Sequence, residues 1–229
     1  MANANPIDTT RPIDTTGTAR VNPRRVSPLW QISCALIIAL LVVPVGVVAL
    51  GSGFGIIRLP FEMYVLAENM PVIFRAHMVT SAMALLLAPV VIGLRHRPHL
   101  HRRFGRVLGG FVVAGGLTAL PVAIVSDSSL VARAGFFTQG CVWLALLVAG
   151  LHAIRSGERD RHQTLMLAMV AVTTGAVWFR LITGTAIALH WPFEPIYAAA
   201  AWSGWIVPLA MCLLYQTRIA KELARERPL

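Results

Sequence analysis

Long apolar segments alternate with short polar connections along most of the 229-residue chain. Six of the apolar segments are long enough to cross a bilayer as a helix, which takes about 20 residues. We place them at residues 29–50, 71–94, 104–125, 131–154, 164–189 and 196–215. The pattern predicts an all-α fold, an integral membrane bundle of six transmembrane helices.

Glycine, serine and proline residues mark several ends of these segments. The sequence GSGFG at 51–55 follows the first segment, and SDSS at 126–129 separates the third from the fourth. Pro71 suits the first turn of the second segment, where the backbone needs no N–H donor. Four further prolines fall inside apolar segments and predict local kinks: Pro44, Pro89, Pro121 and Pro208.

Basic residues gather in alternate connections, and this sets the expected orientation. Short loops rich in Lys and Arg stay on the cytoplasmic side of a membrane. Basic clusters lie before the first segment and after the second, fourth and sixth, whereas the other connections carry only Arg58 and Arg133 beside acidic residues. We therefore expect a multi-pass protein of the bacterial inner (plasma) membrane with both termini in the cytoplasm.

The two ends of the chain are polar. Residues 1–28 contain the sequence PIDTT twice and lack apolar periodicity, so we expect a disordered cytoplasmic tail there. The six-helix transmembrane domain is expected at 29–219. Residues 220–229 are expected to form a basic cytoplasmic tail.

The most basic stretch is RPHLHRRFGRV, residues 97–107, in the connection after the second segment. The net charge of +10 invites nucleic-acid binding, but the chain is 56% hydrophobic and carries no nucleic-acid motif. We interpret this loop as a cytoplasmic anchor that fixes topology and attracts anionic lipid headgroups, at about 1 kcal/mol for each arginine. The arginines concerned are Arg95, Arg97, Arg102, Arg103 and Arg106.

The motifs of soluble enzymes are absent from the sequence. It contains no GxSxG, HExxH, Walker or dinucleotide-binding pattern. Cys34, Cys141 and Cys212 lie in different apolar segments without zinc spacing, as expected for small packing residues. No catalytic residue is predicted, and whether the protein is an enzyme stays open.

A group of ionisable residues falls at membrane depth, where such residues are costly and mark function by default. Arg180, in AVWFRLITG, lies about 24 Å along a continuous fifth helix that starts inside. His77, in FRAHMVTSA, lies about 9 Å from the outer end of the second helix, so both can share a level. Arg75 faces another side of that helix. Glu194 and His190 lie at the outer rim, with Glu194 as a counter-ion for Arg180 or Arg75.

Two interpretations of this outer cluster stay open. In the first, it is a structural ion pair buried between helices. In the second, it is a pocket for an anionic or quinone-like ligand, with Arg180 as the charge and His77 as the hydrogen-bond donor or proton carrier.

A second set of histidines lies at the expected cytoplasmic edge. His101 precedes the third segment, His152 is near the end of the fourth and His162 precedes the fifth, so antiparallel helices bring them to one level. His96 and His99 lie in the adjoining loop. Imidazole binds iron, copper and zinc well, so haem or metal ligation stands as an alternative to simple solvation.

Two stretches resemble the signatures of an uncharacterised bacterial membrane family, called domain of unknown function 2306. They are AHMVTSAMALLLAPVVIGLRHRPHLHRRFGR at 76–106 and RHQTLMLAMVAVTTGAVWFR at 161–180. Ala168 and Val170 depart from the pattern, which carries an arginine and an aromatic residue after the methionine. The resemblance implies a multispan fold and supplies no reaction. The matching residues are His77, His101, Arg102, Gly105, Arg106, His162, Met166 and Arg180.

The architecture also resembles, more distantly, six-helix b-type membrane cytochromes, which hold two haems between paired histidines. Here only His77 with His190, and His152 with His101 or His162, share a leaflet. The cofactor is therefore not determined by the sequence, with haem b and a quinone as the two candidates.

Three functions follow as hypotheses. The leading one is a membrane redox protein that binds a quinone or haem. The second is a transporter or channel for a small anion selected by Arg180. The third is a non-catalytic membrane subunit or assembly factor, in which GGFVVAGG at 109–116 packs against a membrane-protein partner or a second copy.

Overall fold

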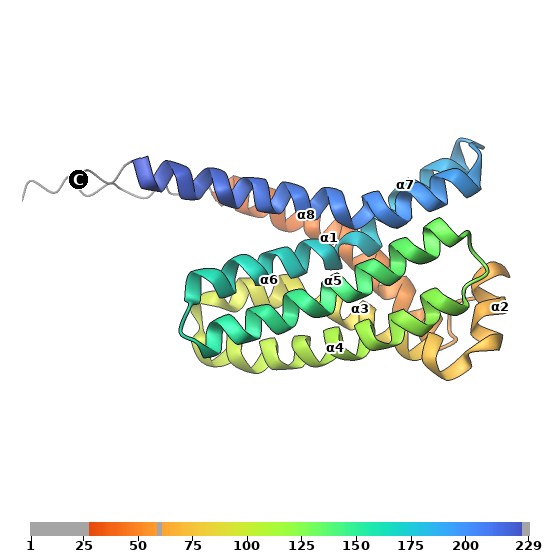
Figure 1. The fold of residues 1–229 in the computed structure, drawn as a ribbon, viewed down its shortest axis with the longest axis horizontal. Coiled ribbons are helices and arrows are strands. Elements are labelled where there is room, and N and C mark those ends of the chain that lie inside the picture. The colour runs from red at the N-terminus through yellow and green to blue at the C-terminus, as the bar shows by residue number, and fades with distance from the viewer. Residues whose placement is uncertain (1–27, 59–60, 226–229) are drawn as a thin grey trace, which may run out of the picture.

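The structure is a computed structural model that describes residues 28–58 and 61–225, with side chains described at 36, 39–58 and 63–218. Every regular element in this part of the chain is helical (Figure 1). In chain order, the elements are α1 (Pro28–Gly53), α2 (Phe61–Asn69), α3 (Pro71–Gly93), the 3-10 turn η1 (Leu94–His96), α4 (Pro98–Val125), α5 (Leu130–Arg155), α6 (Arg159–Thr173), α7 (Gly175–Ala188) and α8 (Phe193–Arg225).

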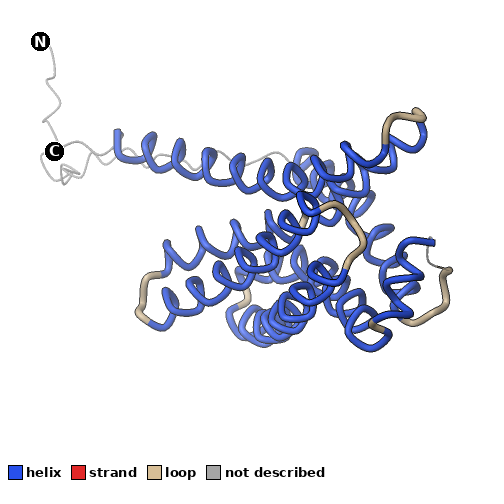
Figure 2. Tube along the Cα trace, turned by 45° about the vertical axis from the view of Figure 1, so that its right-hand side comes forward, coloured by secondary structure: helices blue, strands red, loops and turns tan. Residues whose placement is uncertain are grey.

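Neighbouring helices pack mainly as antiparallel pairs. Helix α3 packs on α4, α5 on α6, and α7 on α8, while α1 lies against α3 and also touches α7. The turns of the bundle gather at two ends (Figure 1). The basic end holds η1 and residues 156–158, and the far end holds α2, residues 126–129 and residues 189–192. Figure 2 shows that α7 and the first part of α8 lean away from the other helices at the far end.

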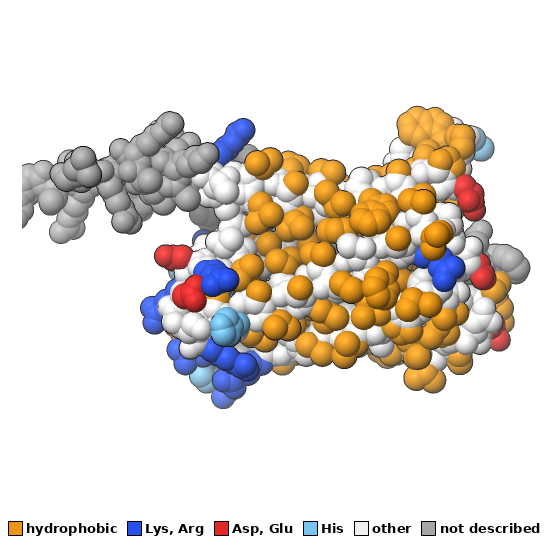
Figure 3. Space-filling model, in the orientation of Figure 1, with side chains coloured by type: hydrophobic (Ala, Val, Ile, Leu, Met, Phe, Trp, Pro, Cys, Tyr) orange, Lys and Arg blue, Asp and Glu red, His pale blue; other side chains and the backbone are white. Residues whose placement is uncertain are grey.

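Five helices are long and apolar enough to span a membrane, and one further apolar helix is shorter. The shorter one is Ala39–Gly53 of α1, assessed over the described side chains. Apolar side chains cover the flank between the two ends, and arginines gather at the basic end (Figure 3). The predicted helical membrane bundle is confirmed, with five candidate spans where six were expected: Pro71–His96, Pro98–Val125, Leu130–Arg155, Arg159–Ala188 and Phe193–Arg218.

Several helix ends agree with the local signals in the sequence. Helix α3 begins at Pro71, and SDSS ends α4 and precedes α5. The Ser129 hydroxyl caps α5 by accepting a hydrogen bond from the Ala132 N–H at 3.4 Å. The Arg133 guanidinium donates to the carbonyls of Ala123 and Ile124 at the end of α4. This tight turn therefore holds α4 and α5 together.

The prediction of one continuous helix over 164–189 is wrong in detail. The segment starts earlier, at Arg159, and is interrupted at Thr174 between α6 and α7. The Thr173 hydroxyl donates to the Met169 carbonyl at 2.9 Å, and the Thr174 hydroxyl donates to the Ala171 carbonyl at 2.7 Å. Such bonds compete with the helical ladder and bend helices.

Other elements differ from the expected boundaries. Helix α2 lies in a connection for which no helix was predicted, and its nine residues are too few to span a bilayer. Helix α4 begins at Pro98 rather than at 104. Helix α8 continues to Arg225, so part of the predicted tail at 220–229 is helical. The predicted tail at 1–28 lies outside the described residues except for its last position.

The core between α3, α4, α5 and α6 is built from small and medium side chains. Ala84 and Val112 are fully buried, as are Met169 and Val172 of α6. Gly116 lets α5 approach α4, because a Cβ there would meet Leu144 Cδ2 at 2.6 Å. Close contact without large side chains is the common way in which membrane helices pack.

Candidate functional site

His77 lies half-buried on α3 and reaches the neighbouring helix α4. Its Nδ1 is 3.0 Å from the Gly115 carbonyl oxygen and 3.3 Å from the Ser81 hydroxyl. Because a carbonyl can only accept, the bond to Gly115 requires Nδ1 to carry the proton. Nε2 then keeps its lone pair and is the nitrogen available to a ligand.

Gly115 makes this contact between helices possible. A Cβ at that position would meet the Ser81 hydroxyl oxygen at 2.9 Å and the Trp143 ring at 3.2 Å. Three helices, α3, α4 and α5, thus converge on one residue without a side chain. A larger residue there would have to displace the Ser81 hydroxyl or the Trp143 ring.

Arg180 lies on α7 and points into the bundle. One guanidinium nitrogen donates to the Ala176 carbonyl at 2.9 Å, one turn earlier in the helix. Helical side chains lean toward their own N-terminus, and α7 begins at Gly175, midway along the span Arg159–Ala188. The side chain is therefore directed toward the middle of the span rather than toward the far end.

The charge of Arg180 acts on two neighbours from other helices. It interacts electrostatically with the His77 ring on α3 and with Tyr197 on α8. The expectation that His77 and Arg180 lie at one level of the membrane stays a prediction. Neither partner carries a negative charge at neutral pH.

A carboxylate partner for Arg180 is missing from the part of the chain that the structure describes. The ion pair found there joins Arg161 and Glu158, at 3.1 Å, on the surface of the basic end. Glu194 and Arg75 are both exposed, and neither forms an ion pair with a described residue. The predicted counter-ion role of Glu194 therefore finds no support in the geometry.

An aromatic cluster surrounds Tyr197. The rings of Phe136, Phe179 and Tyr197 meet edge to face, with centroids 5.0 to 5.8 Å apart. Phe193 adds a tilted contact with Tyr197 at 5.4 Å. These residues come from α5, α7 and α8, so the cluster joins the leaning α7–α8 pair to the bundle beside Arg180.

A second polar group lies at the break between α6 and α7, and the sequence pattern did not predict it. The Trp143 indole N–H donates to the Thr173 hydroxyl at 2.8 Å, and the Gln139 amide donates to the Val172 carbonyl at 3.2 Å. Trp205 is 5% exposed, and its indole N–H has no partner among the described residues. The consecutive Thr173, Thr174 and Gly175 were the available signal, because hydroxyls beside a glycine weaken a helix.

The nitrogens of Trp205, His77 and Arg180 differ in their described hydrogen bonds. Among the described residues, Trp205 Nε1 is the fully enclosed side-chain nitrogen that lacks a partner. The described hydrogen bonds of His77 use Nδ1, and the described hydrogen bond of Arg180 uses one guanidinium nitrogen.

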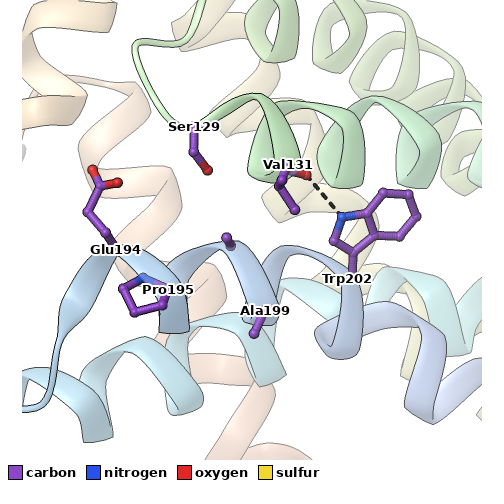
Figure 4. A pocket seen from close by; sticks show the side chains of 7 residues that line it. Ser129, Val131, Glu194, Pro195, Ala199 and Trp202 are labelled. Carbon is purple, nitrogen blue, oxygen red and sulfur yellow. Dashed lines mark hydrogen bonds between the residues drawn. The ribbon is translucent and has the colours of Figure 1, made fainter.

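A groove of about 590 Å³ opens between the starts of α5 and α8 at the far end (Figure 4). The Trp202 indole N–H donates to the Val131 carbonyl at 3.0 Å along one wall, and Glu194 stands at the edge. The lining is mostly apolar: Ser129, Val131, Glu194, Pro195, Ala198, Ala199 and Trp202. Its walls suit a hydrocarbon chain better than a charged group.

The rim histidine predicted beside this cluster lies apart from it. His190 is exposed in the turn after α7 and adopts a left-handed φ of 53°. Its backbone N–H donates to the Ile187 carbonyl at 3.1 Å. The described contacts do not join His190 to His77 or Arg180.

The three histidines predicted at the cytoplasmic edge all lie at the basic end. His101 Nδ1 is 3.0 Å from the Val91 carbonyl of α3, and His162 Nδ1 is 2.8 Å from the Gly150 carbonyl of α5. His152 is exposed. No group of three His, Cys, Asp or Glu side chains suited to a metal occurs among the described residues. His101 and His162 each fasten one helix pair, α4 to α3 and α6 to α5.

Comparison with known families gives one match, to predicted membrane proteins described as DUF2306, over residues 74–216. No curated protein and no solved structure matches the chain significantly. The matched region runs from α3 into α8 and contains His77, Arg180 and Tyr197. It covers more than half of the 229 residues. The chain therefore belongs to the DUF2306 family of multispan membrane proteins of unknown function.

Proposed function

We propose that this protein is a membrane redox protein that binds a quinone-like ligand beside His77 and Arg180. One observation carries the proposal: a cation sits within the apolar bundle, in electrostatic interaction with an imidazole and without a described carboxylate. An arginine at the centre of a membrane helix costs about 2.5 to 3.5 kcal/mol. A ligand oxygen bound to the guanidinium offsets part of that cost.

The chemistry of a quinone fits these two side chains. A quinone carbonyl oxygen accepts hydrogen bonds from the guanidinium nitrogens of Arg180 that are not bonded to Ala176. With Nδ1 held by Gly115, His77 Nε2 can exchange a proton with the ligand oxygen. The electrons come from a separate redox partner.

A binding titration tests the proposal. A short-chain quinone is added to the detergent-purified protein, and quenching of tryptophan fluorescence is followed. Saturable binding that weakens in Arg180→Met and His77→Ala, but not in Arg103→Gln at the basic end, is the expected result. Absence of saturable binding in the wild-type protein contradicts the proposal.

The other hypotheses predict different outcomes. A b-type haem band in the reduced-minus-oxidised spectrum that is lost in His101→Ala or His162→Ala would identify haem, rather than a quinone, as the cofactor. Anion flux through proteoliposomes that depends on Arg180 would indicate a transporter or channel. A protein that binds no quinone or haem and copurifies with another membrane protein would be a non-catalytic subunit or assembly factor.

The proposed topology has six spans, with α1 as the first, in the bacterial inner membrane and with both termini cytoplasmic. Helix α1 has 26 residues, enough for a span. The start of α1 and the end of α8 lie at the basic end (Figure 1), which supports an even number of crossings. The arginines there would face anionic lipid headgroups. Reporter fusions at the two termini should both give a cytoplasmic signal.

A further inference from the structure

A hollow of about 410 Å³ lies at the start of α4, at the basic end. Its lining residues other than Pro98 are spaced at i, i+3, i+4 and i+7, which places them on one face of a helix. The lining residues are Pro98, His99, Arg102, Arg103 and Arg106. The three arginines and the histidine thus line one concave surface.

The opposite face of α4 is the one that packs on α3. His101 Nδ1 bonds the Val91 carbonyl, a Cβ at Gly105 would lie 4.0 Å from Val91, and Leu108 is buried. The basic hollow therefore faces away from the bundle, toward the surrounding membrane. Its arginines are not needed to hold the helices together.

The positive charge of the hollow is not neutralised by the described residues. Arg102, Arg103 and Arg106 form no ion pair there. The acidic residue paired at the same end, Glu158, is bonded to Arg161 in another turn. An anion from outside the described residues is therefore the natural partner of this surface.

The outer face of α4 continues from the hollow as an apolar surface. Val107, Val113 and Leu117 are 50%, 42% and 57% exposed. Gly110 between them has open space around it, with nothing within 4 Å of a Cβ placed there. A lipid with its headgroup in the hollow would have this surface beside its acyl chains.

We propose that the hollow is a specific binding site for a phospholipid whose headgroup carries two phosphates. Arginine binds phosphate through paired hydrogen bonds, and three arginines match two phosphates better than one. The adjoining apolar surface favours a lipid over free phosphate. The site is independent of the quinone site and requires only that the basic end lies at a membrane surface, so each proposal can fail without the other.

Native mass spectrometry of the full-length protein tests the site. The detergent-solubilised protein is titrated with diphosphatidylglycerol, phosphatidylglycerol or phosphatidylcholine. The test variant carries Arg102→Gln, Arg103→Gln and Arg106→Gln. The matched control carries Arg155→Gln, Arg159→Gln and Arg161→Gln, which removes equal charge from the other turn at the same end.

The wild-type protein and the control should retain one diphosphatidylglycerol in preference to the other two lipids. The test variant should lose roughly a hundredfold in affinity, from about fivefold for each arginine. Equal loss in both variants would show diffuse attraction and overturn the proposal. Displacement of the lipid by inorganic diphosphate at matched concentration would also overturn it, because the acyl chains would then contribute nothing. The preference of the wild-type protein for diphosphatidylglycerol over the other two lipids is an independent test that does not depend on any variant folding correctly.

Discussion

The protein places arginines in two contrasting settings. At the basic end, Arg102, Arg103 and Arg106 are exposed on the start of α4, with no role in holding helices together. Within the bundle, Arg180 is half-buried, interacts electrostatically with the imidazole of His77 and bonds a backbone carbonyl of its own helix. The first set is numerous and solvated, whereas the second is a single charge in apolar surroundings.

The difference shows that the most numerous charges in a protein are not necessarily those that matter most for its function. Exposed arginines at a membrane surface keep their hydration and contribute through topology and lipid contacts. A charge within the bundle lacks that hydration and is tolerated only when nearby groups or a ligand offset its cost. The net charge of +10 therefore directs attention to the basic end, while the distinctive chemistry lies with Arg180.

The largest predicted effect is on ligand binding after Arg180→Met. Loss of charge-assisted hydrogen bonds should weaken quinone affinity by roughly ten- to a hundredfold. Thermal stability in detergent should stay the same or rise, because replacing a buried charge by an apolar side chain is often stabilising. If Arg180→Met binds the quinone with wild-type affinity, Arg180 has no role in binding that distinguishes it from the arginines at the basic end.

The next effect concerns the packing beneath His77. Gly115→Ala introduces a Cβ that meets Ser81 and Trp143, and such overpacking destabilises by about 1 to 3 kcal/mol. Gly110→Ala on the same helix is the matched control, since open space surrounds that position. Melting temperatures in detergent measure the difference. Similar values for both variants would show that α3, α4 and α5 do not converge at Gly115.

A smaller effect is expected at the break between α6 and α7. Trp143→Phe removes the bond from the indole N–H to the Thr173 hydroxyl and keeps most of the apolar contact. The Thr173 hydroxyl retains its bond to the Met169 carbonyl, so the loss of stability should be about 1 kcal/mol. Denaturant titration checks this value. An unchanged midpoint would mean that the Trp143 bond contributes nothing to holding the break.

The smallest effect is expected at the basic end. Replacing Arg102, Arg103 and Arg106 by glutamine should change the stability of the folded bundle by less than about 0.5 kcal/mol in detergent. Quinone binding should remain unchanged, while lipid retention falls. A quinone defect in this variant would show that the two ends are coupled.

Much of the fold was predictable because the length of apolar segments and the residues at their ends indicate where membrane helices run. Pro71 and SDSS marked real helix ends. The break at Thr174 was not predicted, since an apolar run of that length resembles one uninterrupted helix. Its cause lies partly in tertiary contacts, because a Cβ at Gly175 would meet Gln139 Nε2 at 2.7 Å.

The candidate site was predictable to a lesser extent. His77 and Arg180 stood out as ionisable residues in apolar segments, and their charges interact electrostatically in the structure. Tyr197 did not stand out, because a tyrosine near a helix start is common at a membrane interface. The bonds of His101 and His162 to neighbouring helices depend on the packing of helix pairs, which spacing along the sequence does not determine.

Photoaffinity labelling with an azido-quinone tests the central claim most directly, because it locates the bound ligand. The purified protein is irradiated with the probe, digested and analysed by peptide mass spectrometry, with excess unlabelled quinone as competitor. The account predicts competed labels on α3 and α7 near His77 and Arg180, and their loss in Arg180→Met. Labels confined to the basic end, or labels that excess quinone does not reduce, would contradict it.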